Sequence, residues 1–351
     1  MNGIVNIYKE RGYTSHDVIA RLRGITRQRK MGHTGTLDPD AEGVLPVCLG
    51  TATRVCDIIT EHSKCYEVAM LLGIGTDSQD VTGELTGHAD KDRLDGLTDE
   101  MIINTISSFT GEYDQLPPMY SAVRMGGQRL YEIARAGKEI ERKPRHVSID
   151  RIEMVSDPIR GRLFDGSAVE HYFDNSSLKA MEKRIDKADR RFERYTEGGI
   201  TEDFPVIRIA FKVRCSKGTY IRSLCSDIGD KLGVFGCVER LMRTRVDIFD
   251  IDDAITLAEA EKYMADGSFE SRLHGAEELF AGMERLDVKE KYDELLMNGN
   301  QLYYRHFKQY ITVPPTPVRV YSSKGEFLGI YGHVEGKAKY TPVKVFIEKE
   351  Q

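Results

Sequence analysis

The chain has 351 residues, 40% of them hydrophobic and 30% charged, and its 50 basic and 56 acidic side chains give a formal net charge of −6. This composition is typical of a globular protein, and the length predicts one large domain with at least one smaller domain. Because the sequence has no run of about 18 apolar residues and no apolar signal segment after Met1, we expect a cytoplasmic protein without membrane contact.

The N-terminal stretch predicts a strand and then a basic helix. Residues 4–8 alternate as in a strand, and Thr14 stands as the N-cap of a helix whose apolar residues recur at helical spacing up to Ile25. Five basic residues against one acid make 15–32 a basic cluster, which suits phosphate binding as well as a solvated helix face.

Further along, apolar spacing and turn residues predict a buried segment at 44–49, strands at 66–73, 147–155 and 206–213, and helices at 98–109 and 220–232. A second basic cluster occupies 124–146. Pro117 and Pro118 force extended backbone just before it, so residues 119–137 are expected to begin as an exposed arm and end in a short helix.

The remaining chain predicts an inserted segment and a separate C-terminal unit. Residues 157–202 are polar, with apolar residues at helical spacing that predict one amphipathic helix and no chemistry. Residues 258–285 are expected to be a helical linker. In 286–351, two alternating apolar runs flank a turn at 322–326, which predicts a β-hairpin and a small β-rich domain.

Nothing in the composition points to a metal or a nucleotide cofactor. The six cysteines are scattered without a C-x-x-C pair, which disfavours a zinc ribbon and a redox motif and favours buried thiols. No dinucleotide-binding or phosphate-loop fingerprint is present either. We therefore expect no cofactor and no metal site.

The octapeptide G-H-T-G-T-L-D-P at 32–39 is the most informative motif. Its glycines free the backbone, and Pro39 biases Asp38 toward an extended conformation that holds its carboxylate rigidly. Alone, an Asp before a Pro in a loop is most often a turn residue. The motif gains weight from three others that follow in order, K-C-Y at 64–66, P-P-M-Y-S-A at 117–122 and C-S-K-G-T-Y-I-R-S-L at 215–224.

Together these four motifs closely resemble the bacterial tRNA pseudouridine-55 synthase family, TruB. The resemblance implies an α+β fold, with a mixed, mostly antiparallel sheet, flanking helices and a central cleft. It implies a catalytic domain at 1–257, with a segment at 117–145 that closes over RNA like a thumb and an insertion at 157–202. The domain at 286–351 would then be an RNA-binding module of the PUA type.

In this family the aspartate of the G-T-L-D-P motif is the catalytic carboxylate, which corresponds to Asp38. A carboxylate beside the ribose can serve as a nucleophile or as a base, and the sequence leaves both roles open. Tyr66 matches the tyrosine that stacks on the base and can take the C5 proton, and Arg222 matches the arginine that pairs with the catalytic aspartate. Asp80 matches an acidic residue of the same ion-pair network.

The resemblance also assigns residues to RNA contact. His33 matches a histidine that enters the RNA stack when the uridine flips out, and Leu241 matches an apolar residue of the uracil pocket. Tyr120, Arg124 and Lys217 are expected to contact RNA, because aromatic and basic side chains together suit a folded loop with unstacked bases.

The implied activity is isomerisation of the T-loop uridine of tRNA to pseudouridine by a monomer without an obligatory protein partner. Two alternatives stay open. A non-catalytic tRNA-folding chaperone could use the same cleft, although the set of Asp38, Tyr66 and Arg222 disfavours it. The start at Met1, without an extension before Gly3, favours the stand-alone type over a guide-RNA-dependent synthase subunit.

Overall fold

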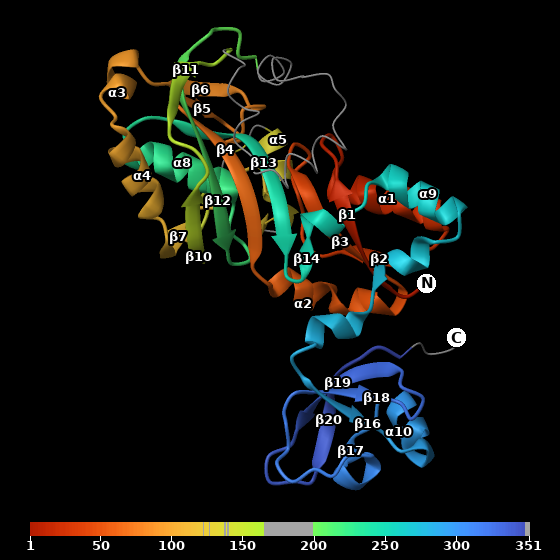
Figure 1. The fold of residues 1–351 in the computed structure, drawn as a ribbon. Helices are drawn as coiled ribbons and strands as arrows, with labels where there is room; N and C mark the ends of the chain where they lie inside the picture. Colours follow the sequence, from red (N-terminus) through yellow and green to blue (C-terminus); the bar gives the residue numbers. More distant parts are fainter. Residues whose placement is uncertain (122, 126, 137, 139, 165–198, 348–351) are drawn as a thin grey trace.

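The computed structural model describes residues 1–121, 123–125, 127–136, 138, 140–164 and 199–347. Within these residues the larger unit is built on an 11-stranded sheet with helices packed against it, and a smaller unit near the C-terminus on a five-stranded sheet (Figure 1). The predicted α+β class, with a mostly antiparallel sheet and a small β-rich C-terminal unit, is confirmed.

Strand β13 lies in the middle of the large sheet, between β3 and β4. Along the main path the strands are β15 (Leu273–His274), β1 (Gly3–Lys9), β3 (Glu42–Leu49), β13 (Gly236–Val246), β4 (Lys64–Leu72), β12 (Pro205–Cys215), β10 (Arg145–Met154) and β7 (Gly111–Gln115). Beside this path, β2 (Met31–His33) pairs with β3, β11 (Ile159–Arg162) with β12 and β14 (Phe249–Asp250) with β13. The contact of β3 with β13 is parallel, and the other described pairings of this sheet are antiparallel.

Two groups of helices cover one face of this sheet (Figure 1). Helices α1 (Ser15–Thr26) and α9 (Leu257–Ala265) pack on each other and share an apolar core with β1 and β3. Helices α4 (Asp99–Ser107) and α8 (Ile221–Lys231) share a second core with β4, β12 and β13. Alternate residues of the same strands form a third core, so that core lies on the opposite face. The junction of β3, β13 and β4 lies between the two helical groups.

The remaining elements are short and connect the main ones. They are α2 (Cys56–Glu61), α3 (Lys91–Asp95), α5 (Leu130–Arg135), the hairpin of β5 (Ile74–Thr76) and β6 (Leu85–His88), and the hairpin of β8 (Arg124–Met125) and β9 (Gln128–Arg129). The short helix expected at the end of 119–137 is α5, and the β8–β9 hairpin precedes it. The amphipathic helix expected in the insertion lies mostly within 165–198, outside the described residues.

The helix caps follow directly from the sequence. Thr14 caps α1 by accepting a hydrogen bond from the backbone N–H of Asp17, whose carboxylate bonds back to Thr14, and Thr98 caps α4 through the N–H of Met101. Each cap satisfies an N–H group that the helix leaves unpaired. Both predicted helix starts are confirmed.

The C-terminal sheet has the order β16-β18-β19-β20-β17. Its strands are β16 (Glu284–Asp287), β18 (Val318–Tyr321), β19 (Phe327–His333), β20 (Lys339–Val345) and β17 (Leu302–Tyr303), with α10 (Asp293–Met297) beside them. Strands β18 and β19 are the predicted hairpin. The expected linker is partly integrated into the large unit, because α9 packs on α1 and β15 pairs with β1. The exact domain limits stay a prediction.

The C-terminal unit is docked on the large one at α2. Arg54 donates to the carbonyl of Val345 over 2.6 Å, and Lys344 forms an ion pair with Asp57. Phe346 packs into the core on the face of the large sheet opposite to α1, α4, α8 and α9. The two units are therefore joined by polar and apolar contacts at the segment that leads into β4.

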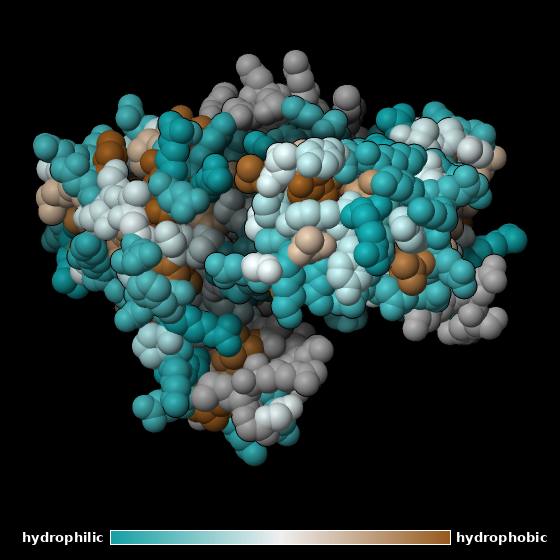
Figure 2. All heavy atoms as spheres, turned by 90° about the horizontal axis from the view of Figure 1, so that it is seen from below, coloured by the Kyte–Doolittle hydropathy of each residue, from teal (hydrophilic) through white to brown (hydrophobic). Residues whose placement is uncertain are grey.

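On the face shown in Figure 2 the surface is mainly hydrophilic, and its apolar residues form small separate groups. Among the described residues, no helix combines the length and the apolar character that crossing a membrane requires.

Gly43 is the tightest backbone contact at the centre of the sheet. Its φ is +103°, and a Cβ there would lie 2.2 Å from the carbonyl oxygen of Arg243. We expect Gly43→Ala to lower the free energy of unfolding by about 4 kcal/mol or more, because strain and overlap with backbone add. Gly111 is the matched control, since its φ is +112° but nothing lies within 4 Å of an added Cβ.

Gly111→Ala should therefore cost only the strain, about 1–3 kcal/mol. Urea unfolding followed by circular dichroism measures both variants. Equal losses in the two variants would show that the close approach of β3 to β13 is unimportant.

Candidate active site

The G-T-L-D-P loop, residues 35–39, is held in place from three sides. At its start, the backbone N–H of Thr34 donates to the carbonyl of Pro46 over 3.2 Å. In its middle, the hydroxyl of Ser15 accepts from the N–H of Leu37 at 2.9 Å and donates to its carbonyl at 3.2 Å. At its end, Gly12 donates to the carbonyl of Pro39. The first turn of α1 and strand β3 thus fix the loop that carries Asp38.

Asp38 is paired with Arg222, as the sequence led us to expect. The guanidinium Nε lies 2.8 Å from Oδ2 of Asp38. Its other two nitrogens donate to the carbonyls of Ser78 at 2.8 Å and Tyr120 at 2.7 Å. The Arg222 side chain is 7% exposed, whereas that of Asp38 is 42% exposed. The cation is therefore buried behind a carboxylate that remains open to a ligand.

Tyr66 and Leu241 lie in the apolar floor below this ion pair. Both belong to the core that also contains Leu37 of the loop, and both are 8% exposed. Burial raises the pKa of Tyr66 to about 12, and contributions from Cys215 and Asp38 act in the same direction, whereas Arg243 opposes the shift. Asp38 therefore lies within electrostatic reach of the phenol.

Asp80 is buried close to the same network. Its carboxylate accepts hydrogen bonds from the N–H and the hydroxyl of Thr82, at 3.0 and 2.8 Å. Burial and the nearby Asp40 raise the pKa of Asp80 to about 6, and Thr82 and Arg222 limit the shift. Asp80 therefore lies within electrostatic reach of Arg222, as expected, and a role in substrate binding stays a prediction.

His33 lies on β2, just before the loop. It is half-buried, and its ring meets that of His16 edge-on at 5.5 Å between centroids. Burial, with smaller contributions from His16 and Arg243, lowers the pKa of His33, so the imidazole is neutral at pH 7. Its buried Nδ1 has no hydrogen-bond partner among the described residues. A neutral ring of this kind is suited to stacking against bases.

The structure brings Tyr120 to the site but not Lys217. Tyr120 binds Arg222 through its carbonyl and donates its hydroxyl to Asp77 at 2.9 Å. Lys217 is exposed and forms an ion pair with Glu61, at the end of α2. Arg124 begins the β8–β9 hairpin, and its side chain lies outside what the structure describes.

Sequence reasoning missed Lys9, which supports the loop from below. This lysine on β1 is fully buried and donates to the carbonyls of Glu10, Tyr13 and Pro39 at 3.1, 2.6 and 3.0 Å. Burial lowers the pKa of Lys9 to about 8, although nearby carboxylates including Asp38 oppose the shift. Nothing in the alternating pattern of β1 distinguishes Lys9 from an exposed strand residue.

Tyr220 and Arg243 were also missed as parts of the site. Tyr220 belongs to the motif that contains Arg222, and burial raises its pKa, with a smaller contribution from Asp38 in the same direction. Gln115 clamps the backbone of Tyr220 by accepting from its N–H and donating to its carbonyl. Arg243 donates to carbonyls of the loop, at 3.3 Å for Gly35 and 3.5 Å for Thr36.

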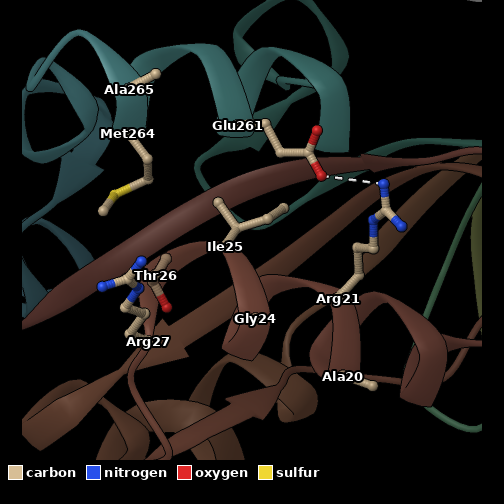
Figure 3. A pocket seen from close by; sticks show the side chains of 9 residues that line it. All are labelled: Ala20, Arg21, Gly24, Ile25, Thr26, Arg27, Glu261, Met264 and Ala265. Carbon is tan, nitrogen blue, oxygen red and sulfur yellow. Dashed lines mark hydrogen bonds and ion pairs between the residues drawn. The ribbon is translucent and has the colours of Figure 1, made fainter.

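A cavity in the described structure lies away from these residues. It encloses about 720 Å³ between α1 and α9, and Arg21 and Glu261 face each other across it in an ion pair of 3.0 Å (Figure 3). None of its lining residues belongs to the loop or contacts Asp38 in the described structure. Within the described residues no group of three or more His, Cys, Asp or Glu side chains could hold a metal ion.

The buried Lys9 predicts a dependence of stability on pH. Its pKa of about 8 in the folded chain is below the ordinary value of 10.5, so between these values the unfolded chain binds more protons. The contribution of Lys9 to the free energy of unfolding therefore rises with pH across this window, by up to about 3 kcal/mol. Below pH 8 the contribution is constant.

Lys9→Met removes this titration. We expect the difference in unfolding free energy between wild type and variant to shift in favour of wild type from pH 8 to 10.5, as measured by urea unfolding. Parallel stability curves for the two proteins would contradict the burial of a titrating lysine.

Comparison with known proteins agrees with this geometry. Residues 23–164 match the model of the TruB family pseudouridylate synthase N-terminal domain, and residues 222–286 match that of the tRNA pseudouridylate synthase B C-terminal domain. The tRNA pseudouridine synthase B of Lachnoclostridium phytofermentans is 42% identical over 99% of this chain and 100% of its own length. That of Clostridium perfringens is 36% identical over 94% of both chains.

Solved structures show the same fold at lower identity. A chain from an H/ACA RNP bound to a substrate RNA containing 2′-deoxyuridine has a TM-score of 0.60 and 23% identity, over 99% of this chain and 85% of that one. A chain from a Cbf5-Nop10-Gar1 complex has a TM-score of 0.59 and 24% identity, over 98% and 85%. Identity of 42% across almost the entire length establishes that this chain belongs to the TruB family of pseudouridylate synthases.

Proposed function

We propose that this chain isomerises the uridine at position 55, in the T-loop of tRNA, to pseudouridine, with Asp38 as the catalytic residue. The observation that carries the proposal is the ion pair of Asp38 with Arg222, in which the cation is 7% and the carboxylate 42% exposed. The names of the full-length relatives support tRNA as the substrate.

The reaction breaks the bond between N1 of uracil and C1′ of the ribose and forms a bond between C5 and C1′. A carboxylate beside the ribose can attack C1′ or remove a proton from C2′, and both routes require a fixed orientation. Arg222 supplies that orientation, because its Nε binds Asp38 while its other two nitrogens bind the carbonyls of Ser78 and Tyr120. The guanidinium cannot turn without losing these bonds.

Tyr66 and Leu241 would form the pocket for the detached uracil. The side chains lie in one apolar cluster under the loop, and a uracil ring can stack on the phenol and contact the leucine. His33, neutral and lacking a partner at Nδ1 in the described residues, would take the place of the uridine in the RNA stack.

Contacts to the rest of the tRNA would come from the thumb segment and the C-terminal unit. The carbonyl of Tyr120 accepts a hydrogen bond from Arg222. Closure of the segment at 117–145 over RNA would therefore affect the position of Arg222 and its ion pair with Asp38. Arg124 and Lys217 carry the charge that phosphates require. The docked C-terminal unit would bind the acceptor arm as a PUA-type module.

The chain is proposed to act in the cytoplasm as a monomer without an obligatory protein partner. The full-length curated relatives named tRNA pseudouridine synthase B, at 32–42% identity, support this reading over a subunit of a guide-RNA particle. The chaperone alternative would instead require a tRNA-folding activity that does not depend on Asp38.

Asp38→Asn tests the proposed chemistry. We expect loss of tritium release from a tRNA transcript carrying [5-³H]uridine by at least about 10⁴-fold, while tRNA affinity stays within about twofold, because the amide keeps the shape but neither attacks nor accepts a proton. Asp95→Asn on the exposed helix α3 is the matched control and should keep full activity.

A second control replaces the T-loop uridine of the transcript by cytidine, which should abolish release from wild type. Conversion by Asp38→Asn, or undiminished release from the cytidine transcript, would refute the proposal.

A further inference from the structure

Arg243 is a buried cation that the proposed mechanism has not yet used. Its side chain is among the largest fully buried ones, with 1% exposure. Its hydrogen bonds in the described structure go to the carbonyls of Val44 at 2.7 Å, Gly35 at 3.3 Å and Thr36 at 3.5 Å. None of these acceptors is a carboxylate. A buried guanidinium normally has a carboxylate partner, because burying an unpaired charge is costly. The presence of Arg243 at this buried position therefore needs an explanation.

The sheet register places Arg243 directly beside Tyr66. The two residues are opposite each other on the neighbouring strands β13 and β4, so their side chains leave the same face of the sheet. A register shift follows immediately, between Arg243 and Arg245. Such irregularities re-aim side chains beside active sites. The guanidinium is therefore directed toward the loop and the phenol together.

The electrostatic consequence for the phenol is specific. Burial raises the pKa of Tyr66, and the positive charge of the adjacent Arg243 lowers it. Conversely, burial lowers the pKa of Arg243, and Tyr66 is the group that raises it. The cation thus stabilises the phenolate in a place where burial alone would suppress it.

We propose that Arg243 is the positioning residue that makes Tyr66 the base for C5 and at the same time fixes the backbone of the catalytic loop. The proposal rests on the proposed function, since it concerns the last chemical step of the same reaction. After C5 has bonded to C1′, C5 carries both its hydrogen and the ribose. The phenolate oxygen of Tyr66 takes this proton.

The bonding pair of the C5–H bond returns to the ring and restores the C5–C6 double bond, with the negative charge passing to N1. N1 then takes a proton from solvent, and the phenol of Tyr66 returns its proton to solvent. One proton is lost from C5 and one is gained at N1, so the product is an isomer of the substrate and no other reactant is needed.

The charged and titratable groups around the phenol come from four segments. Arg243 faces it from β13, Cys215 from β12 and Asp38 from the loop. Lys64 precedes Tyr66 on β4 by two residues and donates to the carbonyls of Thr60 and His62, and burial together with Arg243 lowers its pKa. Among the groups that act on Tyr66, Arg243 is the cation, so its charge is the one whose removal should impair proton abstraction.

The test compares Arg243→Gln with Arg243→Lys. Glutamine donates to carbonyls but is neutral, whereas lysine keeps the charge and loses the planar fork. For Arg243→Gln we expect tritium release from [5-³H]uridine tRNA to fall on the order of 100-fold and to climb through alkaline pH. A primary isotope effect with 5-deuterouridine should appear or increase, because C5 deprotonation becomes rate-limiting. Arg243→Lys should keep the wild-type pH profile at a reduced rate.

A transcript with 5-fluorouridine at the target position isolates the earlier steps, because fluorine at C5 cannot leave as a cation and proton removal is never reached. The rate at which Arg243→Gln rearranges this substrate should stay within about threefold of the wild-type rate. Thermal unfolding and tRNA affinity confirm that both variants are folded.

Equal losses with uridine and 5-fluorouridine, with no change in isotope effect or pH profile, would overturn the role of Arg243 and leave it as a support of the loop. Failure of the proposed function is distinguishable, because wild type would then release no tritium from tRNA.

Discussion

The ion pair of Asp38 with Arg222 holds the proposed site together. The guanidinium bonds to the carboxylate at 2.8 Å and to the carbonyls of Ser78 and Tyr120, so one side chain from α8 ties together three loops that are distant in sequence. Planar guanidinium geometry makes this possible, since its donors point in fixed directions within one plane. The Asp38 carboxylate remains 42% exposed while the buried guanidinium of Arg222 binds one of its oxygens.

The buried cations below the catalytic loop donate hydrogen bonds to backbone carbonyls. Lys9 donates to three carbonyls, Lys64 to two and Arg243 to three. Burial lowers the pKa of each of them, so their charge is held against a desolvation penalty. The hydrogen bonds to backbone carbonyls offset part of this desolvation penalty, and they also fix the backbone that carries these carbonyls. The conformation of the catalytic loop therefore depends on buried positive charge as well as on its hydrogen bonds to α1 and β3.

Much of this could be predicted from the sequence, and the exceptions have a common physical cause. The caps at Thr14 and Thr98, the C-terminal hairpin and the pairing of Asp38 with Arg222 rest on local signals or on a family motif. Strand β13 was not predicted, although it is the central strand, because its arginines look like the exposed side of a strand.

The structure shows why that pattern misleads. Arg240 is paired with Glu42 at 3.0 Å, and Arg243 bonds to the carbonyl of Val44, almost 200 positions away in each case. Periodicity reports on polarity, whereas burial of a charge depends on partners that only the tertiary fold supplies. Lys9 was missed for the same reason, since its three acceptors lie in turns that the β1 pattern does not reveal.

The exposures of Asp38 and Tyr66 also restrict which nucleotide can react. The carboxylate is 42% exposed, but the phenol is only 8% exposed and sits in the apolar floor with Leu241. A base that is stacked and paired in a duplex cannot reach such a floor while its ribose lies beside the carboxylate. A loop nucleotide that leaves its stack can do both, because unstacking costs least where pairing is absent. If these two residues act as proposed, selection for an extruded nucleotide follows from their difference in exposure, before any base-specific contact is considered.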